Sequence, residues 1–128
     1  MRLLGIGIDI IQNKRIKSLM KNKTFLKRTF GINEVKLSKK IFNRNNYFAK
    51  RFAAKEAFAK ALGTGFRNDL NFKDIEVLND NLGKPYYFKS KKITKLIKKI
   101  FNIKKYNLFL SISDEKDYSI AFTTLQTK

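Results

Sequence analysis

Residues 48–62 read FAKRFAAKEAFAKAL, an alanine-rich run without glycine or proline that stops just before Gly63. Alanine is the best helix former and glycine commonly follows the last helical residue, so the run predicts one long helix over Phe48–Leu62. At about 100° per residue, apolar side chains surround nearly its whole circumference. We therefore expect this helix to lie in the centre of the domain.

Charged residues within this run are not gathered on one polar face. Phe52, Glu56 and Lys60 follow at steps of four and form one row along the helix, while Arg51 and Lys55 form a second row nearby. An ordinary Glu–Lys surface pair would contribute only about 0.3–0.5 kcal/mol and is common. Alanine and phenylalanine flank this pair on both sides, which favours a carboxylate held in apolar surroundings.

The turn Gly63-Thr64-Gly65 follows the helix directly. Glycines beside Lys60 and Arg51 would let a phosphate approach backbone amides while the cations neutralise it. The signal is weak alone, because glycine here is more often only a helix cap. It is not a P-loop, because its glycines follow the helix instead of preceding it.

The N-terminal stretch Leu3–Ile11 is short, apolar and rich in isoleucine, which predicts a buried strand. Side chains alternate across a strand, so its two faces are Leu4, Ile6, Ile8 and Ile10 on one side, and Gly5, Gly7 and Asp9 on the other. The isoleucine side is expected to be solid core. The glycine side predicts close approach of a ligand or another backbone.

Asp9 at the end of the glycine side needs a cation or several donors, unless it merely ends the strand and faces water. Taken together with Glu56, the nearby cations and the glycine turn, it suits a magnesium ion that bridges protein and phosphate oxygens.

The other segments predict an α+β domain: an antiparallel sheet packed with the long central helix and shorter helices. One domain is expected over residues 1–128. In the first half of the chain we expect a helix capped by Asn13 and one or two short helices within 24–46, with a break near Gly31. In the second half we expect strands at Ile75–Leu78 and Tyr86–Phe88 joined by the turn 81–85, and then a helix over Ile93–Phe101. A hairpin of Leu108–Ser113 with Tyr118–Leu125 is expected to end the domain.

Composition excludes several classes of site. The 128 residues contain no cysteine and no histidine, so disulfides, thiolate metal sites and histidine catalysis are ruled out. Lysine and arginine number 29 against 10 acids, a formal charge of +19, which favours an anionic partner. Codon drift toward lysine in an A/T-rich genome is the competing explanation. No targeting or membrane-spanning segment is recognised, and a cytoplasmic protein is expected.

Several of these stretches resemble holo-[acyl-carrier-protein] synthase, the small, stand-alone family of 4'-phosphopantetheinyl transferases, in order and spacing. The matching motifs are Gly5-Ile6-Gly7-Ile8-Asp9-Ile10 with Arg15-Ile16, the helix 48–62 with its Gly63-Thr64-Gly65 turn, Asn81-Leu82-Gly83-Lys84-Pro85, and Ser111-Ile112-Ser113-Asp114-Glu115. Asp114 stands where many members carry histidine, so a histidine base is not possible here.

The resemblance implies transfer of the 4'-phosphopantetheine arm of coenzyme A to a serine of apo acyl carrier protein, releasing adenosine 3',5'-bisphosphate and supporting fatty acid biosynthesis. It implies Mg²⁺ on Asp9 and Glu56, with Glu56 and Lys60 catalytic. Coenzyme A is expected on Arg51, Lys55, Lys60, Gly63, Thr64, Gly65, Gly83, Lys84 and Pro85.

The family further implies that the acidic carrier docks on the first helix at Lys14 and Arg15, and that the protein is a homotrimer with active sites between subunits. The glycine side of the first strand looks too open to be closed by its own chain, which agrees with a shared site. Neither nucleic acid nor a membrane is expected as partner.

Two other classes compete with this interpretation. A nucleic-acid-binding module would use the positive charge and the run Tyr86-Tyr87-Phe88 for stacking, but gives no role to Asp9 or Glu56. A non-catalytic scaffold would bind acidic proteins through the helix that carries Arg15.

Overall fold

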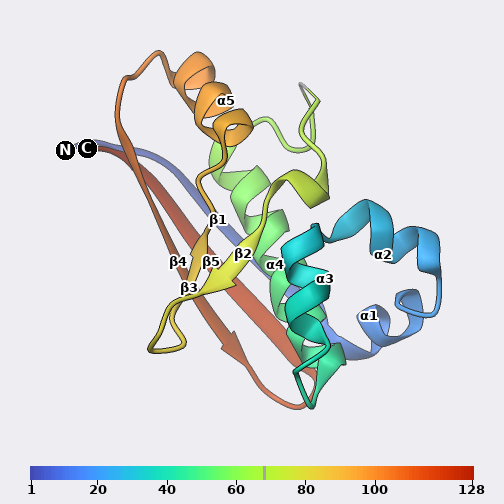
Figure 1. Ribbon diagram of the computed structural model, residues 1–128. Coiled ribbons are helices and arrows are strands. Elements are labelled where there is room, and N and C mark those ends of the chain that lie inside the picture. The colour runs from blue at the N-terminus through green and yellow to red at the C-terminus, as the bar shows by residue number, and fades with distance from the viewer. Residues whose placement is uncertain (68) are drawn as a thin grey trace.

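A computed structural model describes residues 1–67 and 69–128 and shows an α+β arrangement with antiparallel sheets (Figure 1). Its main sheet has three strands in the order β1-β5-β4, and a second sheet pairs β2 with β3. The elements are β1 (Leu3–Gln12), α1 (Asn13–Leu19), α2 (Lys23–Thr29), α3 (Ile32–Ser38), α4 (Arg44–Leu62), η1 (Phe72–Asp74), β2 (Val77–Asn79), β3 (Pro85–Tyr87), α5 (Lys91–Phe101), β4 (Tyr106–Asp114) and β5 (Tyr118–Thr127).

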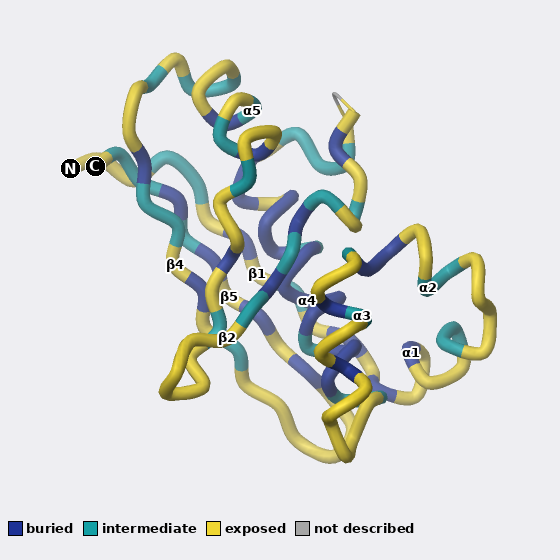
Figure 2. The backbone as a smooth tube through the Cα atoms, in the orientation of Figure 1, coloured by how far each residue is buried: buried dark blue, intermediate teal, exposed yellow. Residues whose placement is uncertain are grey.

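Helix α4 lies across the main sheet and is buried along most of its length (Figures 1 and 2). It ends at Leu62 as predicted, because Gly63 adopts the left-handed conformation with φ of 79°. It begins at Arg44, earlier than expected, because the Asn43 side chain accepts a hydrogen bond from Asn46 N at 3.1 Å and caps the first turn. The predicted central helix is confirmed.

The glycine side of β1 meets the backbone of α4. A Cβ atom at Gly7 would lie 1.7 Å from the Ala57 carbonyl oxygen, and one at Gly5 would lie 1.8 Å from that of Ala61. Only glycine permits so close an approach. The expected close backbone contact is therefore present, but the prediction that this side is too open for its own chain to close is wrong.

The opposite side of β1, which carries the isoleucines, is not the solid core that the sequence predicted. Ile6, Ile8 and Ile10 are 52%, 57% and 60% exposed in the single chain, although their pattern predicted solid core. The strand register continues this surface across the sheet, and we call it the isoleucine face: Ile6, Ile8, Ile10, Phe109, Ile120 and Phe122. The core lies on the other side because α4 packs there.

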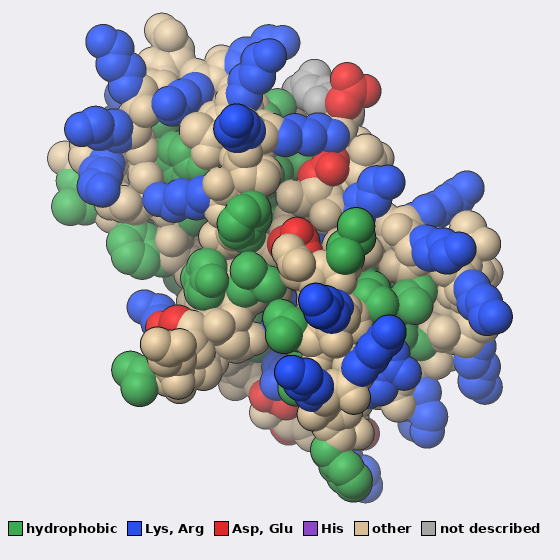
Figure 3. Space-filling model, in the orientation of Figure 1, with side chains coloured by type: hydrophobic (Ala, Val, Ile, Leu, Met, Phe, Trp, Pro, Cys, Tyr) green, Lys and Arg blue, Asp and Glu red, His purple; other side chains and the backbone are tan. Residues whose placement is uncertain are grey.

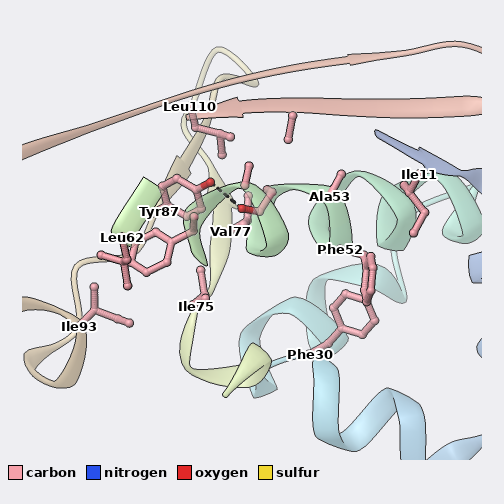
Figure 4. Close-up of a cluster of buried hydrophobic side chains, with 14 of the residues drawn as sticks. Ile11, Phe30, Phe52, Ala53, Leu62, Ile75, Val77, Tyr87, Ile93 and Leu110 are labelled. Atoms are coloured by element: carbon pink, nitrogen blue, oxygen red, sulfur yellow. Dashed lines mark hydrogen bonds between the residues drawn. The ribbon is translucent and has the colours of Figure 1, made fainter. Parts of the chain in front are cut away.

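Behind the sheet, the core surrounds α4 (Figure 4). Phe58 of α4 packs edge-on against the Tyr87 ring, with centroids 5.1 Å apart. The Tyr87 hydroxyl donates to the Ala54 carbonyl at 2.6 Å and lies 2.6 Å from the Thr123 hydroxyl, so burial and hydrogen bonding fix β3 against α4 and β5. Helix α5 closes the core at one end with Ile93 and Ile97.

The short helices predicted within 24–46 are α2 and α3, separated near Gly31 as expected, although α2 begins one residue earlier, at Lys23. The cap expected from Asn13 is wrong, because α1 begins at Asn13 itself and its N-cap is Gln12. The Asn13 side chain turns instead to the β4–β5 turn. In the described part of the chain, no helix is long and apolar enough to cross a membrane.

Candidate functional site

Asp9 lies at the contact between β1 and α4. The Lys60 ammonium donates to Asp9 Oδ1 at 3.2 Å and to the Ile8 carbonyl at 2.9 Å. The Asp9 side chain is only 16% exposed, whereas that of Lys60 is 54% exposed. Asp9 is therefore anchored and largely enclosed, while the lysine head reaches solvent.

Glu56 lies one turn before Lys60 on α4 and is partly buried. Burial raises the pKa of Glu56 and the nearby Asp9 charge raises it further, while Lys60 and Arg15 oppose both effects. The two carboxylates are thus close enough to repel each other, and a cation between them would relieve this repulsion.

The donor set fits a hard metal ion. Asp9 and Glu56 supply only carboxylate oxygens, the ligands that Mg²⁺ prefers. Among the residues described here, no group of three or more His, Cys, Asp or Glu side chains gathers as a metal site. A magnesium ion on these two carboxylates would therefore complete its shell with water or substrate oxygens, as at many phosphate sites.

A cavity of about 510 Å³ adjoins Glu56. Arg15 of α1 lines it together with Glu56, and Phe25, Phe52 and Phe72 form an aromatic wall. We call this cavity the Glu56 groove. It combines an exposed cation, an apolar wall and a carboxylate of raised pKa, so it suits an anionic partner that also presents an apolar side chain.

Arg51 is 4% exposed, and its guanidinium lies 3.6 Å from the Tyr47 ring centroid. Burial lowers the pKa of Arg51. Its terminal nitrogen donates to Asn79 Oδ1, but its Nε–H is buried without a partner among the described residues.

A small cavity of about 150 Å³ lies beside Arg51, and we call it the Arg51 pocket. It brings together the predicted cofactor residues Arg51, Gly83 and Pro85 with Asp114, which the family resemblance had singled out as the position of a histidine in many members. It adds two side chains that sequence reasoning missed, Lys50 and Asn79. The Asn79 amide donates to the Gly83 carbonyl, a contact that only the fold reveals.

Other predicted cofactor residues lie apart within the single chain. Lys84 lines a separate cavity of about 450 Å³ with Phe109 and Phe122 of the isoleucine face. Gly63, Thr64 and Gly65 end α4, whereas Arg51 lies about 18 Å away along the helix at about 1.5 Å per residue. The expectation that Arg51 and this turn hold one phosphate together is therefore corrected.

The environment of Lys55 argues against the prediction that this lysine contacts coenzyme A. Its side chain is 0% exposed, and its ammonium donates to Glu34 Oε1 at 2.6 Å, to the Phe72 carbonyl at 3.0 Å and to the Ile75 carbonyl. Burial lowers the pKa of Lys55 and the Glu34 carboxylate opposes the change. The ammonium has no access to a coenzyme A phosphate in this arrangement, so Lys55 is a core residue.

The surface explains why a nucleic-acid-binding module is less favoured. Lysine and arginine are spread widely over the face shown in Figure 3 instead of forming one track. Tyr87 is 5% exposed and belongs to the core, so the run Tyr86-Tyr87-Phe88 does not present a continuous stacking platform. Lys14 and Arg15, by contrast, are exposed on α1 as the docking hypothesis requires.

The sequence of this chain is similar to that of known proteins over nearly its whole length. Residues 5–123 match the sequence model of the 4'-phosphopantetheinyl transferase superfamily. The chain is 57% identical over 128 residues to holo-[acyl-carrier-protein] synthase of Pelagibacter ubique, covering 100% of both proteins. It is 47% identical over 131 residues to the enzyme of that name from Ehrlichia chaffeensis, covering 98% of each.

Solved structures show the same fold. The crystal structure of holo-[acyl-carrier-protein] synthase from Neisseria meningitidis has a TM-score of 0.88 at 39% identity, covering 98% of this chain and 99% of that one. The Bacillus anthracis synthase, crystallised in complex with CoA (3',5'-ADP), has a TM-score of 0.82 at 35% identity, covering 100% of both chains.

Proposed function

This chain belongs to the 4'-phosphopantetheinyl transferase superfamily, in the family of holo-[acyl-carrier-protein] synthases, and we propose how its own residues carry out that family's reaction. The reaction moves the 4'-phosphopantetheine arm of coenzyme A onto a serine of apo acyl carrier protein. Adenosine 3',5'-bisphosphate leaves. The observation that carries the assignment of residues is the meeting of Asp9, Glu56 and Lys60 at the β1–α4 contact, beside the Glu56 groove.

Asp9 and Glu56 are the proposed Mg²⁺ ligands. When bound, Mg²⁺ would neutralise charge on the pyrophosphate of coenzyme A. Glu56 is also the first candidate for the base that takes the serine proton, since a raised pKa brings a carboxylate closer to working pH. Lys60 has an exposed ammonium close to both and is suited to neutralise charge on the departing bisphosphate.

Coenzyme A is proposed to contact two groups of residues. The Arg51 pocket, lined also by Lys50, Gly83 and Pro85, offers two cationic side chains to a phosphate. Lys84 and the turn Gly63-Thr64-Gly65 lie elsewhere on the chain and would contact other parts of this large cofactor, or the cofactor of a neighbouring subunit.

The carrier protein is proposed to dock on α1. Lys14 and Arg15 are exposed there, and Arg15 shares the Glu56 groove with the proposed base. An acidic carrier would therefore reach the site along a basic helix, and its serine would arrive beside Glu56. The attraction should weaken with salt, because exposed charges are screened.

A homotrimer is proposed as the working form. The isoleucine face is an exposed apolar surface on a sheet whose other side packs against α4, mainly through β1 and β5. Surfaces of this kind mark association sites. Lys84 shares its cavity with Phe109 and Phe122 of this face, so a neighbouring chain seated there would also reach a proposed cofactor residue.

The decisive experiment measures Mg²⁺-dependent transfer of labelled phosphopantetheine from coenzyme A to apo carrier protein. Asp9→Ala and Glu56→Ala are expected to abolish transfer while circular dichroism stays unchanged. Asp74→Ala is the matched control, because Asp74 has the same 16% exposure as Asp9 and also pairs with a lysine, Lys92. Near-normal transfer by either site variant at saturating magnesium would refute the two-carboxylate site.

A further inference from the structure

Asn13 is a buried polar residue with an unusually complete set of hydrogen bonds. It is 6% exposed, and its amide nitrogen donates to the carbonyl oxygens of Glu115 and Lys116, both at 3.0 Å. Its amide oxygen accepts from the Ser119 hydroxyl at 2.8 Å, and its backbone N–H donates to the Asp117 carbonyl at 2.8 Å. One residue thus ties the start of α1 to the β4–β5 turn.

Helix α1 has no other side-chain hydrogen bond among the described residues that anchors its first turn. It is only seven residues long, so it is not stable by itself. Its N-cap residue Gln12 makes no side-chain cap, and no acidic residue stands in its first turn. Besides Asn13, its buried residue is Ile16. Leu19 adds partly buried apolar contact with the core. Apolar packing has little directional preference, whereas hydrogen bonds have preferred directions and so define the rotation of the helix more sharply.

Residues at both ends of this connection line the proposed binding cavities. Arg15, two positions after Asn13, lines the Glu56 groove. Asp114, at the end of β4 beside the bonded turn, lines the Arg51 pocket. The Asn13 hydrogen bonds therefore couple the docking helix to the strand that borders the proposed cofactor pocket.

We propose that Asn13 is a positioning residue that fixes the rotation of α1 and so holds Arg15 beside Glu56 for the incoming carrier protein. The proposal rests on the function proposed above. The Asn13 side chain itself touches neither substrate. Both amide N–H groups and the amide oxygen are used within the protein, which is typical of a polar group that specifies geometry.

Steady-state kinetics with separately varied carrier protein and coenzyme A provide the test. Asn13→Ala is expected to raise the KM for carrier protein about fivefold to tenfold, the equivalent of one or two net hydrogen bonds, while the KM for coenzyme A stays within twofold. Ser119→Ala removes one bond and should show a smaller rise of the same kind. Ser90→Ala is the control for general destabilisation, because it removes the side-chain cap of α5 and leaves α1 untouched.

A double-mutant cycle separates positioning from loss of fold. If Asn13 acts through Arg15, then adding Asn13→Ala to Arg15→Ala should change the carrier KM by less than twofold. The proposal is overturned if Asn13→Ala has the same effect in both backgrounds, if it raises both KM values equally, or if it matches Ser90→Ala. Absence of transfer by the wild-type chain would instead refute the proposed function, so the two failures are distinguishable.

Should Asn13→Ala fail to fold, Ser119→Ala carries the same cycle with Arg15→Ala. The Ser119 hydroxyl is buried and bonds only one side of the amide, so its loss leaves the donations to the turn in place. A carrier KM for Ser119→Ala equal to that of the wild type would then overturn the proposal.

Discussion

Replacing Lys55 by methionine tests whether this residue belongs to the core or to the cofactor site. Lys55 and Glu34 are both 0% exposed and their charged atoms lie 2.6 Å apart. Glu34 also accepts hydrogen bonds from Gly31 N at 2.9 Å and Val77 N at 3.1 Å. The pair therefore joins α3, α4 and the segment that leads into β2.

The expected loss of stability is large. Methionine keeps the length and apolar stem of Lys55 but leaves the Glu34 carboxylate buried without its cation, and the Phe72 and Ile75 carbonyls without a donor. Breaking one side of a buried ion pair costs about 3–5 kcal/mol. Since domains have a free energy of unfolding of about 5–15 kcal/mol, Lys55→Met should bring this protein near the edge of folding.

The assay is urea unfolding followed by circular dichroism at one fixed protein concentration, because association would shift the apparent stability. Lys92→Met is the matched control: it breaks the Lys92–Asp74 pair, whose lysine is 48% exposed, and should cost no more than about 1 kcal/mol. Lys55→Met/Glu34→Gln should be more stable than Lys55→Met, since no unpaired charge is left. A Lys55→Met protein that unfolds like the control but loses coenzyme A affinity would refute the reasoning and return Lys55 to the cofactor site.

Three further outcomes follow from the site and the sheet. The folded state raises the pKa of Glu56, so ionisation of this carboxylate destabilises the fold as pH rises through that pKa. In thermal scans without magnesium, Glu56→Gln should therefore have a higher Tm than the wild type at neutral pH. The difference in Tm should vanish below about pH 4, where the carboxyl is protonated in both the folded and the unfolded protein. Gly7→Ala places a Cβ 1.7 Å from the Ala57 carbonyl oxygen and should cost about 1–3 kcal/mol or more by urea unfolding. Ile8→Lys should abolish the proposed trimer in sedimentation velocity, whereas Ile32→Lys, at a site 85% exposed but off the isoleucine face, should leave it intact.

The sequence predicted helices and strands well where neighbouring residues decide where an element begins or ends. The end of α4 at Leu62 follows from Gly63, and the β2–β3 hairpin follows from its turn residues. The start of α4 was missed because a cap by Asn43 depends on the backbone it caps. The sequence also could not show that the Asn13 side chain bonds to the β4–β5 turn instead of capping α1, since its acceptors lie more than 100 positions away in the sequence.

Prediction of the site failed where burial decides the role of a charge. Arg51 and Lys55 lie one turn apart in the same row, so their spacing cannot distinguish them. The difference comes from Glu34, 21 residues before Lys55, which provides a buried counter-ion. Arg51 instead keeps an unpaired N–H next to a cavity. A pattern on one helix cannot reveal a partner on another.

The alternation along β1 accounts for the packing, the chemistry and the proposed assembly at once. Because Gly5 and Gly7 have no side chains, α4 can approach the strand to backbone contact. Asp9 is the next residue on that side, so the same approach brings its carboxylate to Lys60 and within electrostatic reach of Glu56. Ile6, Ile8 and Ile10, on the opposite side of the strand, then have no place in the chain's own core and point outward. A side chain at either glycine would therefore weaken the fold and also move the two carboxylates apart, which ties the proposed metal site to the close backbone packing of β1 on α4.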